Sequence, residues 1–258
     1  MTCRHFRSLL AAAILSIATP VWANGTATYT EALSDFTAGR FETCSEISAL
    51  LGTARGYALA ARATLVRALY LTPPGERLPL FRSAADYAKT ALDKEPGHVE
   101  ASLQLVIALG NLARISNPLK AHVAGYAEEA KALLDSVIAR DPENAYAYAI
   151  LGAWHAEIVH EAGPLLASNL YGATQGDALA AFDRARKLAP QSILVITEYA
   201  KALIRLDQEH FALRAEKLLD RALAMAPHNA LEALVQKDAS EQRTALSQPS
   251  PQRIGGRG

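Results

Sequence analysis

Apolar residues along this chain recur at intervals of three and four positions, the spacing that places them on one face of a helix. The pattern begins near Thr28 and continues to Leu246, and Gly, Pro and Asn residues interrupt it. The alternation of apolar and polar residues that marks a strand does not occur. We therefore predict an all-α fold of about ten helices in antiparallel pairs.

The interruptions divide the pattern into five helix pairs and a last helix. Pro73 and Pro74 end one helix, because Pro removes a backbone donor and clashes with the preceding turn. The last helix is more polar, which suits the end of a stack that has no neighbour to cover its outer face. The expected ranges are about 28–38 and 41–51, 54–71 and 76–94, 98–115 and 118–139, two helices on either side of 163–176, 192–206 and 211–225, and 229–246.

The clearest motif lies in residues 141–191. An aromatic residue is followed by Leu-Gly, a second ring three positions beyond the Gly, then Ala-x-x-x-Phe and a closing Pro. These positions are Tyr148, Leu151, Gly152, His155, Ala178, Phe182, Ala185 and Pro190. The motif predicts one long repeat, which is a pair of antiparallel helices.

Prolines repeat this register along the chain. Pro96, Pro142, Pro190 and Pro227 each follow by five positions a small apolar residue, namely Ala91, Val137, Ala185 and Ala222. Successive prolines are 46, 48 and 37 residues apart. A simple tetratricopeptide repeat has a period of about 34 residues, so we expect lengthened helices or connections here.

At these positions the chain resembles the tetratricopeptide repeat (TPR) family, specifically over about 130–227 and more weakly over 28–96. It departs where His155 replaces the usual Tyr and where the turn between helices is expanded. The resemblance implies antiparallel helix hairpins stacked as a TPR-like right-handed solenoid, with a concave face that binds proteins or peptides. In layout the chain is also similar to the T component of periplasmic tripartite transporters.

The first 23 residues have the pattern of a secretory signal. Arg4 and Arg7 precede an apolar run from position 9 to 18, and Val21-Trp22-Ala23 offers a cleavage site. The alternative is an uncleaved anchor, although the run is shorter than the roughly 20 residues that a spanning helix needs. We expect a soluble periplasmic protein with no membrane span after cleavage, a repeat domain at 24–246 and a disordered tail at 247–258.

The net charge and the cysteine content limit the kinds of partner that the protein can bind. Removal of 1–23 changes the count from 26 basic and 26 acidic residues to 24 and 26, a net charge of −2. A near-neutral surface offers nothing that attracts nucleic acid. Only Cys44 remains, so the thiol either packs in the core, which we favour, or pairs with another chain.

Residues 163–176 form the most unusual connection. About fourteen uncharged, largely apolar residues stand where a standard repeat turns in about three. We expect a loop that lies against something, because a solvated loop would be polar. Either it fills the concave face, or it contacts a ligand or partner through residues such as Tyr171.

A cluster of rings and acids precedes that connection, at Trp154, His155, Glu157 and His160. The two His are five positions apart, about 140° around a helix, so they diverge and do not form a zinc-protease pair. We expect Glu157 and His160 to pair. Their role is either structural or ligand contact, with metal binding the third alternative.

We expect no enzyme, no cofactor and no catalytic or metal residue, because no Gly-x-Ser-x-Gly turn, phosphate loop or Cys pair occurs. The favoured function is a periplasmic binding or scaffold protein that mediates protein–protein interaction through an open concave groove. The alternative is a small-molecule-binding accessory protein with an enclosed apolar cavity beside His155 and Tyr171; a hydrolase with an unrecognised site is a third. The expected binding residues are Tyr148, Trp154, His155, Glu157, His160 and Tyr171.

Overall fold

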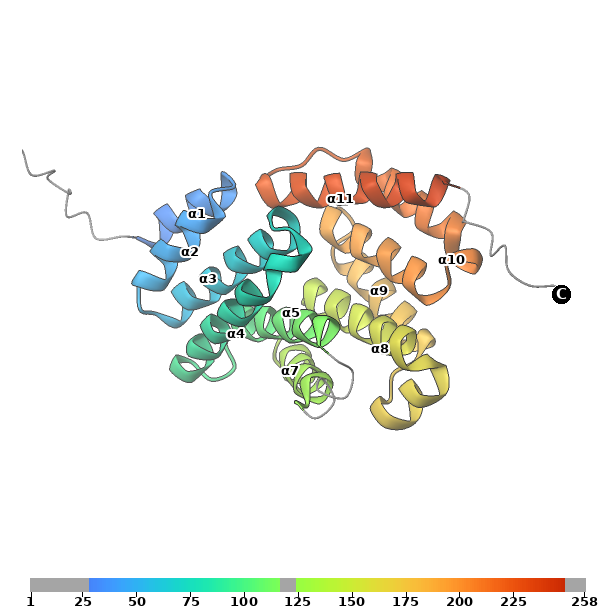
Figure 1. Ribbon diagram of the computed structural model, residues 1–258, viewed down its shortest axis with the longest axis horizontal. Helices are drawn as coiled ribbons and strands as arrows, with labels where there is room; N and C mark the ends of the chain where they lie inside the picture. The colour runs from blue at the N-terminus through green and yellow to red at the C-terminus, as the bar shows by residue number, and fades with distance from the viewer. Residues whose placement is uncertain (1–27, 117–123, 249–258) are drawn as a thin grey trace, which may run out of the picture.

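The computed structural model describes residues 28–116 and 124–248, and all regular elements in these ranges are helical, as the sequence predicts. The α-helices lie in antiparallel pairs with short connections (Figure 1). The elements are α1 (Tyr29–Thr37), α2 (Phe41–Leu50), α3 (Ala54–Val66), the π-turn η1 (Arg67–Leu71), the 3-10 turn η2 (Pro74–Glu76), α4 (Arg77–Lys94), α5 (Val99–Ile115), α7 (Tyr126–Arg140), α8 (Ala145–Tyr171), α9 (Gln175–Leu188), α10 (Ile193–Leu223) and α11 (Ala230–Ser247).

Side-chain caps fix where most of these helices begin. A polar side chain at the N-cap accepts a hydrogen bond from a backbone N–H in the first turn, which would otherwise have no partner. Thr28 also takes part in a reciprocal capping box with Glu31. The capping residues are Thr28, Thr53, His98, Asn144, Thr174, Ser192 and Asn229.

The repeat motif makes the central contact within the fourth pair, α8 and α9, and joins this pair to the fifth. A Cβ atom added to Gly152 would lie 2.5 Å from the ring of Phe182, so only glycine lets α8 and α9 approach this closely. Phe182 stacks on Tyr199 of α10 with ring centroids 4.8 Å apart. The Tyr199 hydroxyl donates to Asp183, and burial raises the pKa of Tyr199 to about 12. The motif residues thus join one repeat to the next.

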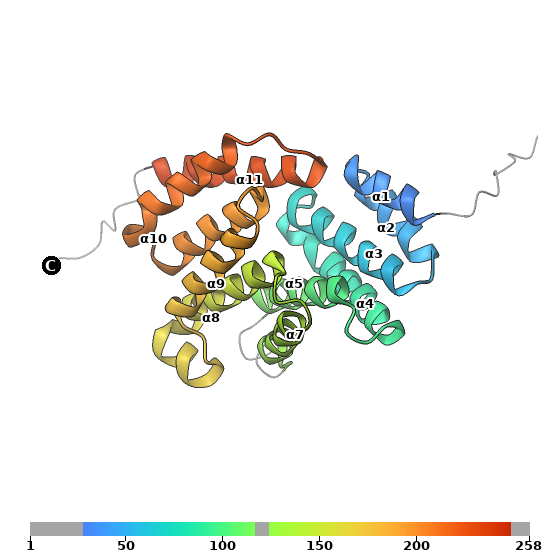
Figure 2. The ribbon, with the colours of Figure 1, turned by 180° about the vertical axis from the view of Figure 1, so that it is seen from behind.

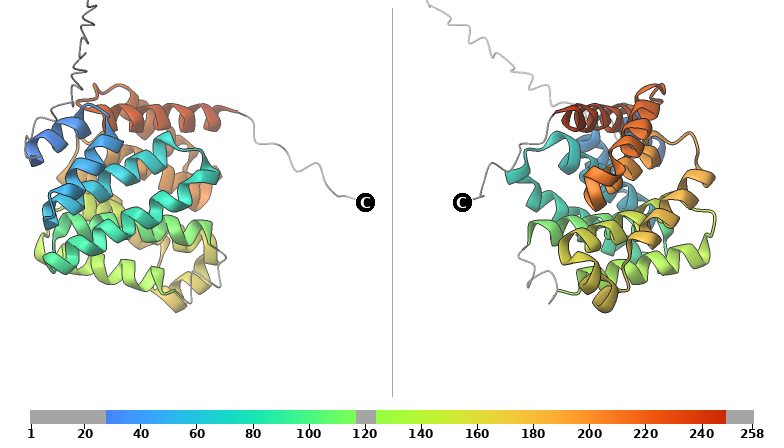
Figure 3. Two further views of the ribbon diagram at one scale, coloured as in Figure 1. Left: turned by 60° about the vertical axis from the view of Figure 1, so that its left-hand side comes forward. Right: turned by 90° about the vertical axis from the view of Figure 1, so that its right-hand side faces the viewer.

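The stack of helices curves until its two ends meet. α11 lies across the molecule from α10 toward α1 and contacts both α1 and η1 (Figures 1 and 2). Side views show the same helix covering one side of the stack (Figure 3). The first turns of α11 therefore have neighbours that the sequence did not indicate, through Ala230, Leu231 and Leu234. The open concave groove stays a prediction.

Several predicted boundaries differ from the structure. The helix expected from 118 begins at Tyr126, after Gly125 in the left-handed conformation. The helix expected to end at Leu71 finishes with the π-turn η1, and α11 extends to Ser247, the expected start of the tail. The predicted signal at 1–23, the Asn117-Pro118 step and residues 249–258 lie outside the described residues.

Candidate functional site

The unusual connection at 163–176 is mostly helical, so the predicted loop is wrong. α8 breaks at Gly163, whose φ of 77° and ψ of 157° are open essentially only to glycine. Pro164 then begins a new helical segment, since Pro suits the first turn of a helix. This segment, Pro164–Tyr171, ends at Gly172, and we call it the leucine segment.

The leucine segment projects from the body, at the lower right of Figure 1. Leu165, Leu166 and Leu170 are 75, 53 and 63% exposed. Residues 162–176 carry no charge. One expectation was that the apolar side chains fill the concave face, and within this structure these three leucines face outward instead. Contact with a ligand or partner stays a prediction.

The underside of the segment is anchored by small residues. Ala167 and Ala173 are fully buried against a cluster that includes Ala130 and Leu134 of α7. Tyr171 is half-buried at the edge of the same cluster, and its pKa is raised by burial and by the charge of Glu128. The segment therefore has a fixed base and an exposed apolar outer face.

Trp154 and His155 are core residues. The Trp154 indole Nε1 donates to the carbonyl of Ala127 at 3.1 Å. His155 Nδ1 accepts from the backbone N–H of Thr174 at 3.4 Å, and burial lowers the pKa of His155. A neutral ring with an accepting Nδ1 fixes the turn that leads into α9. Both side chains are buried. Contact between a partner and Trp154 or His155 stays a prediction.

Glu157 does not pair with His160 as predicted. Its carboxylate accepts from Arg114 Nε of α5 at 3.0 Å and from Arg205 Nη1 of α10 at 2.6 Å. His160 Nδ1 donates to the carbonyl oxygen of Arg205 at 2.9 Å. Glu157 pairs with arginine rather than with His160 because the fork-shaped guanidinium offers several donors to a carboxylate. Glu157 thus links helices from three repeats.

Tyr148 lies apart from these residues. It packs against the core between α8 and α9, and the Arg184 guanidinium lies 5.8 Å from its ring centroid. The structure therefore distributes the predicted binding residues between the core, an ion-pair network and the base of the leucine segment. The sequence identified the uncharged stretch but not its exposed members, Leu165, Leu166 and Leu170. A predicted loop has no regular periodicity, so the sequence could not indicate which of its side chains are exposed.

A second group of polar residues lies where η1, α10 and α11 meet. Lys201 Nζ is 2.8 Å from Glu198 Oε1 and 3.0 Å from Asp238 Oδ2. Burial disfavours the lysine charge, but Glu198, Tyr70 and Asp238 outweigh it and raise the pKa of Lys201. Burial and the charge of Glu198 raise the pKa of Tyr70. No sequence pattern indicated this group, because its members are up to 168 positions apart.

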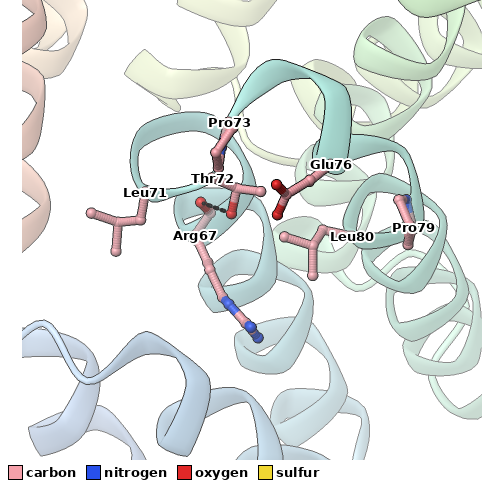
Figure 4. A pocket seen from close by; sticks show the side chains of 7 residues that line it. All are labelled: Arg67, Leu71, Thr72, Pro73, Glu76, Pro79 and Leu80. Atoms are coloured by element: carbon pink, nitrogen blue, oxygen red, sulfur yellow. Dashed lines mark hydrogen bonds between the residues drawn. The ribbon is translucent and has the colours of Figure 1, made fainter.

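Two hollows in the described surface lie away from His155 and Tyr171. One of about 350 Å³ is shown in Figure 4, with Thr72 donating to the carbonyl of Arg67 at its floor. Its lining residues are Arg67, Leu71, Thr72, Pro73, Glu76, Pro79 and Leu80. Another, of about 290 Å³, lies near the end of α11. Neither has the enclosed apolar form expected beside His155 for a small-molecule site.

Two further kinds of feature are absent from the described ranges. Within 28–116 and 124–248, no three His, Cys, Asp or Glu side chains gather as a metal ion would require. Among the helices of the same ranges, none combines the length and apolar character needed to cross a bilayer.

Comparison with solved structures identifies the class. A thermophilic TPR protein of Thermus thermophilus superposes with a TM-score of 0.60 at 17% identity, over 84% of this chain and 96% of that one. At this identity the likeness establishes the fold alone: a TPR-like helical-repeat solenoid. Folds of this class typically serve as scaffolds for protein–protein interaction and are typically non-enzymatic.

A sequence-family model gives the family. The model described as "Regulator of microtubule dynamics protein 1-3" matches residues 57–247. The chain belongs to this family. No curated protein matches the chain.

Proposed function

We propose that this chain is a scaffold protein that binds a protein partner through the leucine segment. The supporting observation is the exposure of Leu165, Leu166 and Leu170 on a helical segment with an anchored base. Contiguous apolar patches are uncommon on soluble monomers, and they mark interaction sites. A preformed helical face also has little conformational entropy to lose on binding.

Acidic residues around the segment indicate the kind of partner. Glu161 is exposed just before the break, Glu128 lies close enough to affect Tyr171, and Asp177 follows the uncharged stretch. Like charges would oppose a face-to-face contact between two copies and would oppose an anionic membrane surface. The fitting partner is a protein with an apolar groove bordered by Lys or Arg, which would receive the segment as a helix in a groove.

A leucine-to-serine triple variant tests this proposal. The partner is first identified by photo-crosslinking from position 166 in the native host, then purified and titrated by calorimetry. Leu165→Ser, Leu166→Ser and Leu170→Ser together should weaken binding at least tenfold, since buried apolar anchors dominate such interfaces. The matched control is Leu213→Ser, because Leu213 is 74% exposed on α10, outside the leucine segment. Equal affinity of the triple variant and the parent protein would contradict the proposal.

The charge of the partner is tested separately with Glu128→Lys. Against a basic rim this reversal should slow association and remove part of the salt dependence, because rim charges act mainly on the association rate. Glu143→Lys, on the turn before α8, is the control for net charge. Faster association of the Glu128 variant would indicate an acidic partner instead.

The proposal also includes export of the protein to the periplasm and a role without catalysis. The signal pattern at 1–23 supports action in the periplasm, and the fold class supports a role without catalysis. Fractionation of cells that express the chain with and without 1–23 tests the location. Retention of both forms in the cytoplasm would overturn it.

The family's name attributes regulation of microtubule dynamics to its named members. For this chain we carry over only the general role that the name implies, which is action on another protein. Purified tubulin is a defined probe for the same calorimetric titration, with the leucine triple variant as its control.

A further inference from the structure

The contact between the first and last helices of the described stack is narrow. Ala230, Leu231 and Leu234 of α11 pack against the N-terminal cluster that contains Phe36 and Phe41. Ala230 lies so close that a Cβ atom added to Gly39 would be 3.0 Å from its own Cβ. We call this contact, together with Tyr70 of η1, the seam.

Two residues join separate cores across the seam. Tyr70 and Leu231 each pack both against the N-terminal cluster and against the larger core of α8 to α11. α11 is tied to α10 by the chain, and Gln236 also donates to the carbonyls of Ala222 and Met225. α1 and η1 have no such covalent link to α11. The seam can therefore separate without disturbing any connection between helices.

Closure of the seam partly buries charged groups. Three charged residues lie beside Tyr70, namely Glu198, Lys201 and Asp238. The ammonium group of Lys201 forms ion pairs with both carboxylates. Asp238 Oδ2 receives no well-aligned hydrogen bond from the described residues, although Lys201 Nζ is 3.0 Å away. Partial burial of these ions costs desolvation free energy that their pairing only partly returns. Opening would rehydrate these groups and lose only the few apolar contacts of the seam.

We propose that α11 is a clasp, which opens at the seam and exposes Tyr70 and the charged face of α10. The clasp couples the first and last elements of the chain and converts a closed ring into an open arc. It is independent of the leucine segment, which lies on α8, away from the seam. A protein that binds no partner at the leucine segment would still open in this way.

Distance measurement between spin labels tests the clasp in the full chain. Labels at Ser34→Cys and Lys237→Cys, both exposed, report the separation of α1 and α11, with Cys3 and Cys44 replaced by Ala. The parent should show a main short distance and a minor longer one. Leu234→Ser removes an apolar contact of the seam and should enlarge the longer population several-fold.

The matched control is Leu246→Ser, which removes a similar contact between α11 and its own core rather than the seam. It should leave the distance distribution unchanged. A variant with the opposite effect is Asp238→Asn, which reduces the partly buried charge and should decrease the longer population. Circular dichroism confirms the helical fold of each variant. A single short distance in parent, Leu234→Ser and Asp238→Asn alike would overturn the clasp.

Discussion

Some side chains in this protein have local structural roles that their residue types alone do not indicate. His155 is the clearest case, because it stands at a repeat position usually held by Tyr and uses its ring nitrogen to hold the turn before α9. Gly152 is another, because the absence of a side chain creates the space that Phe182 fills.

Stability should depend on pH through His155. Burial lowers the pKa of His155 below its ordinary value of 6.5, so between the two values only the unfolded chain binds the proton. The contribution of the neutral ring is complete above 6.5 and decreases as the pH falls through the folded pKa. Urea unfolding from pH 7.5 to 5 should show this loss, and His155→Gln, which keeps an acceptor for Thr174, should reduce the slope. Equal slopes in both proteins would contradict the assignment.

Substitution of Gly152 tests the close approach of α8 and α9. Gly152→Ala should lower the free energy of unfolding by about 1–3 kcal/mol, because its methyl group would overlap the Phe182 ring. Gly110→Ala in α5 is the control, since nothing lies within 4 Å of its added Cβ. That change should raise the free energy of unfolding by about 0.5–1 kcal/mol. Urea denaturation measures both, and a stabilising Gly152→Ala would contradict the packing argument.

At the scale of elements, the break inside α8 decides what the molecule presents to its surroundings. A continuous helix would carry residues 164–171 in a different direction, and the leucines would not share this exposed outer face. Gly163 and Pro164 produce the break together, because Pro disfavours helical geometry in the residue before it.

Replacement of Gly163 should therefore loosen the leucine segment. Gly163→Ala places a side chain at φ 77°, which costs about 1–3 kcal/mol. Hydrogen exchange should become faster at the amides of 164–171 while α4 and α5 keep their protection. Gly176→Ala is the control, because its added Cβ meets only an ordinary contact at 3.7 Å. Unchanged exchange in the Gly163 variant would show that the break needs no glycine.

At the scale of the whole molecule, side chains distant in sequence hold the repeats together. Glu157 receives hydrogen bonds from arginines of α5 and α10. A half-buried carboxylate with two charged donors stabilises more than an exposed ion pair does.

Neutralising Glu157 should weaken the whole stack. Glu157→Gln should lower the free energy of unfolding by about 1–2 kcal/mol, because two arginines lose their shared anion. Glu161→Gln, an exposed acid of the same helix, should change it by less than about 0.5 kcal/mol. Thermal unfolding by calorimetry compares the two. Equal effects would mean that Glu157 has no special role.

The sequence by itself determined the class of fold. Helical spacing, the motif from Tyr148 to Pro190 and the proline register follow from local geometry, which neighbouring residues fix without distant contacts. Even the unusual stretch at 163–176 was visible, because composition is a local property.

Tertiary structure alone decided how the parts meet. The position of 164–171 against the body depends on the base that α7 offers to Ala167 and Ala173. The partners of Glu157 and the group around Lys201 come from separate repeats, so no spacing along the chain encodes them. In a solenoid, curvature arises from a small rotation between successive repeats, and here it brings α11 to α1. Sequence patterns describe each helix contact locally. The contact of α11 with α1 depends on the geometry of all the helix contacts together.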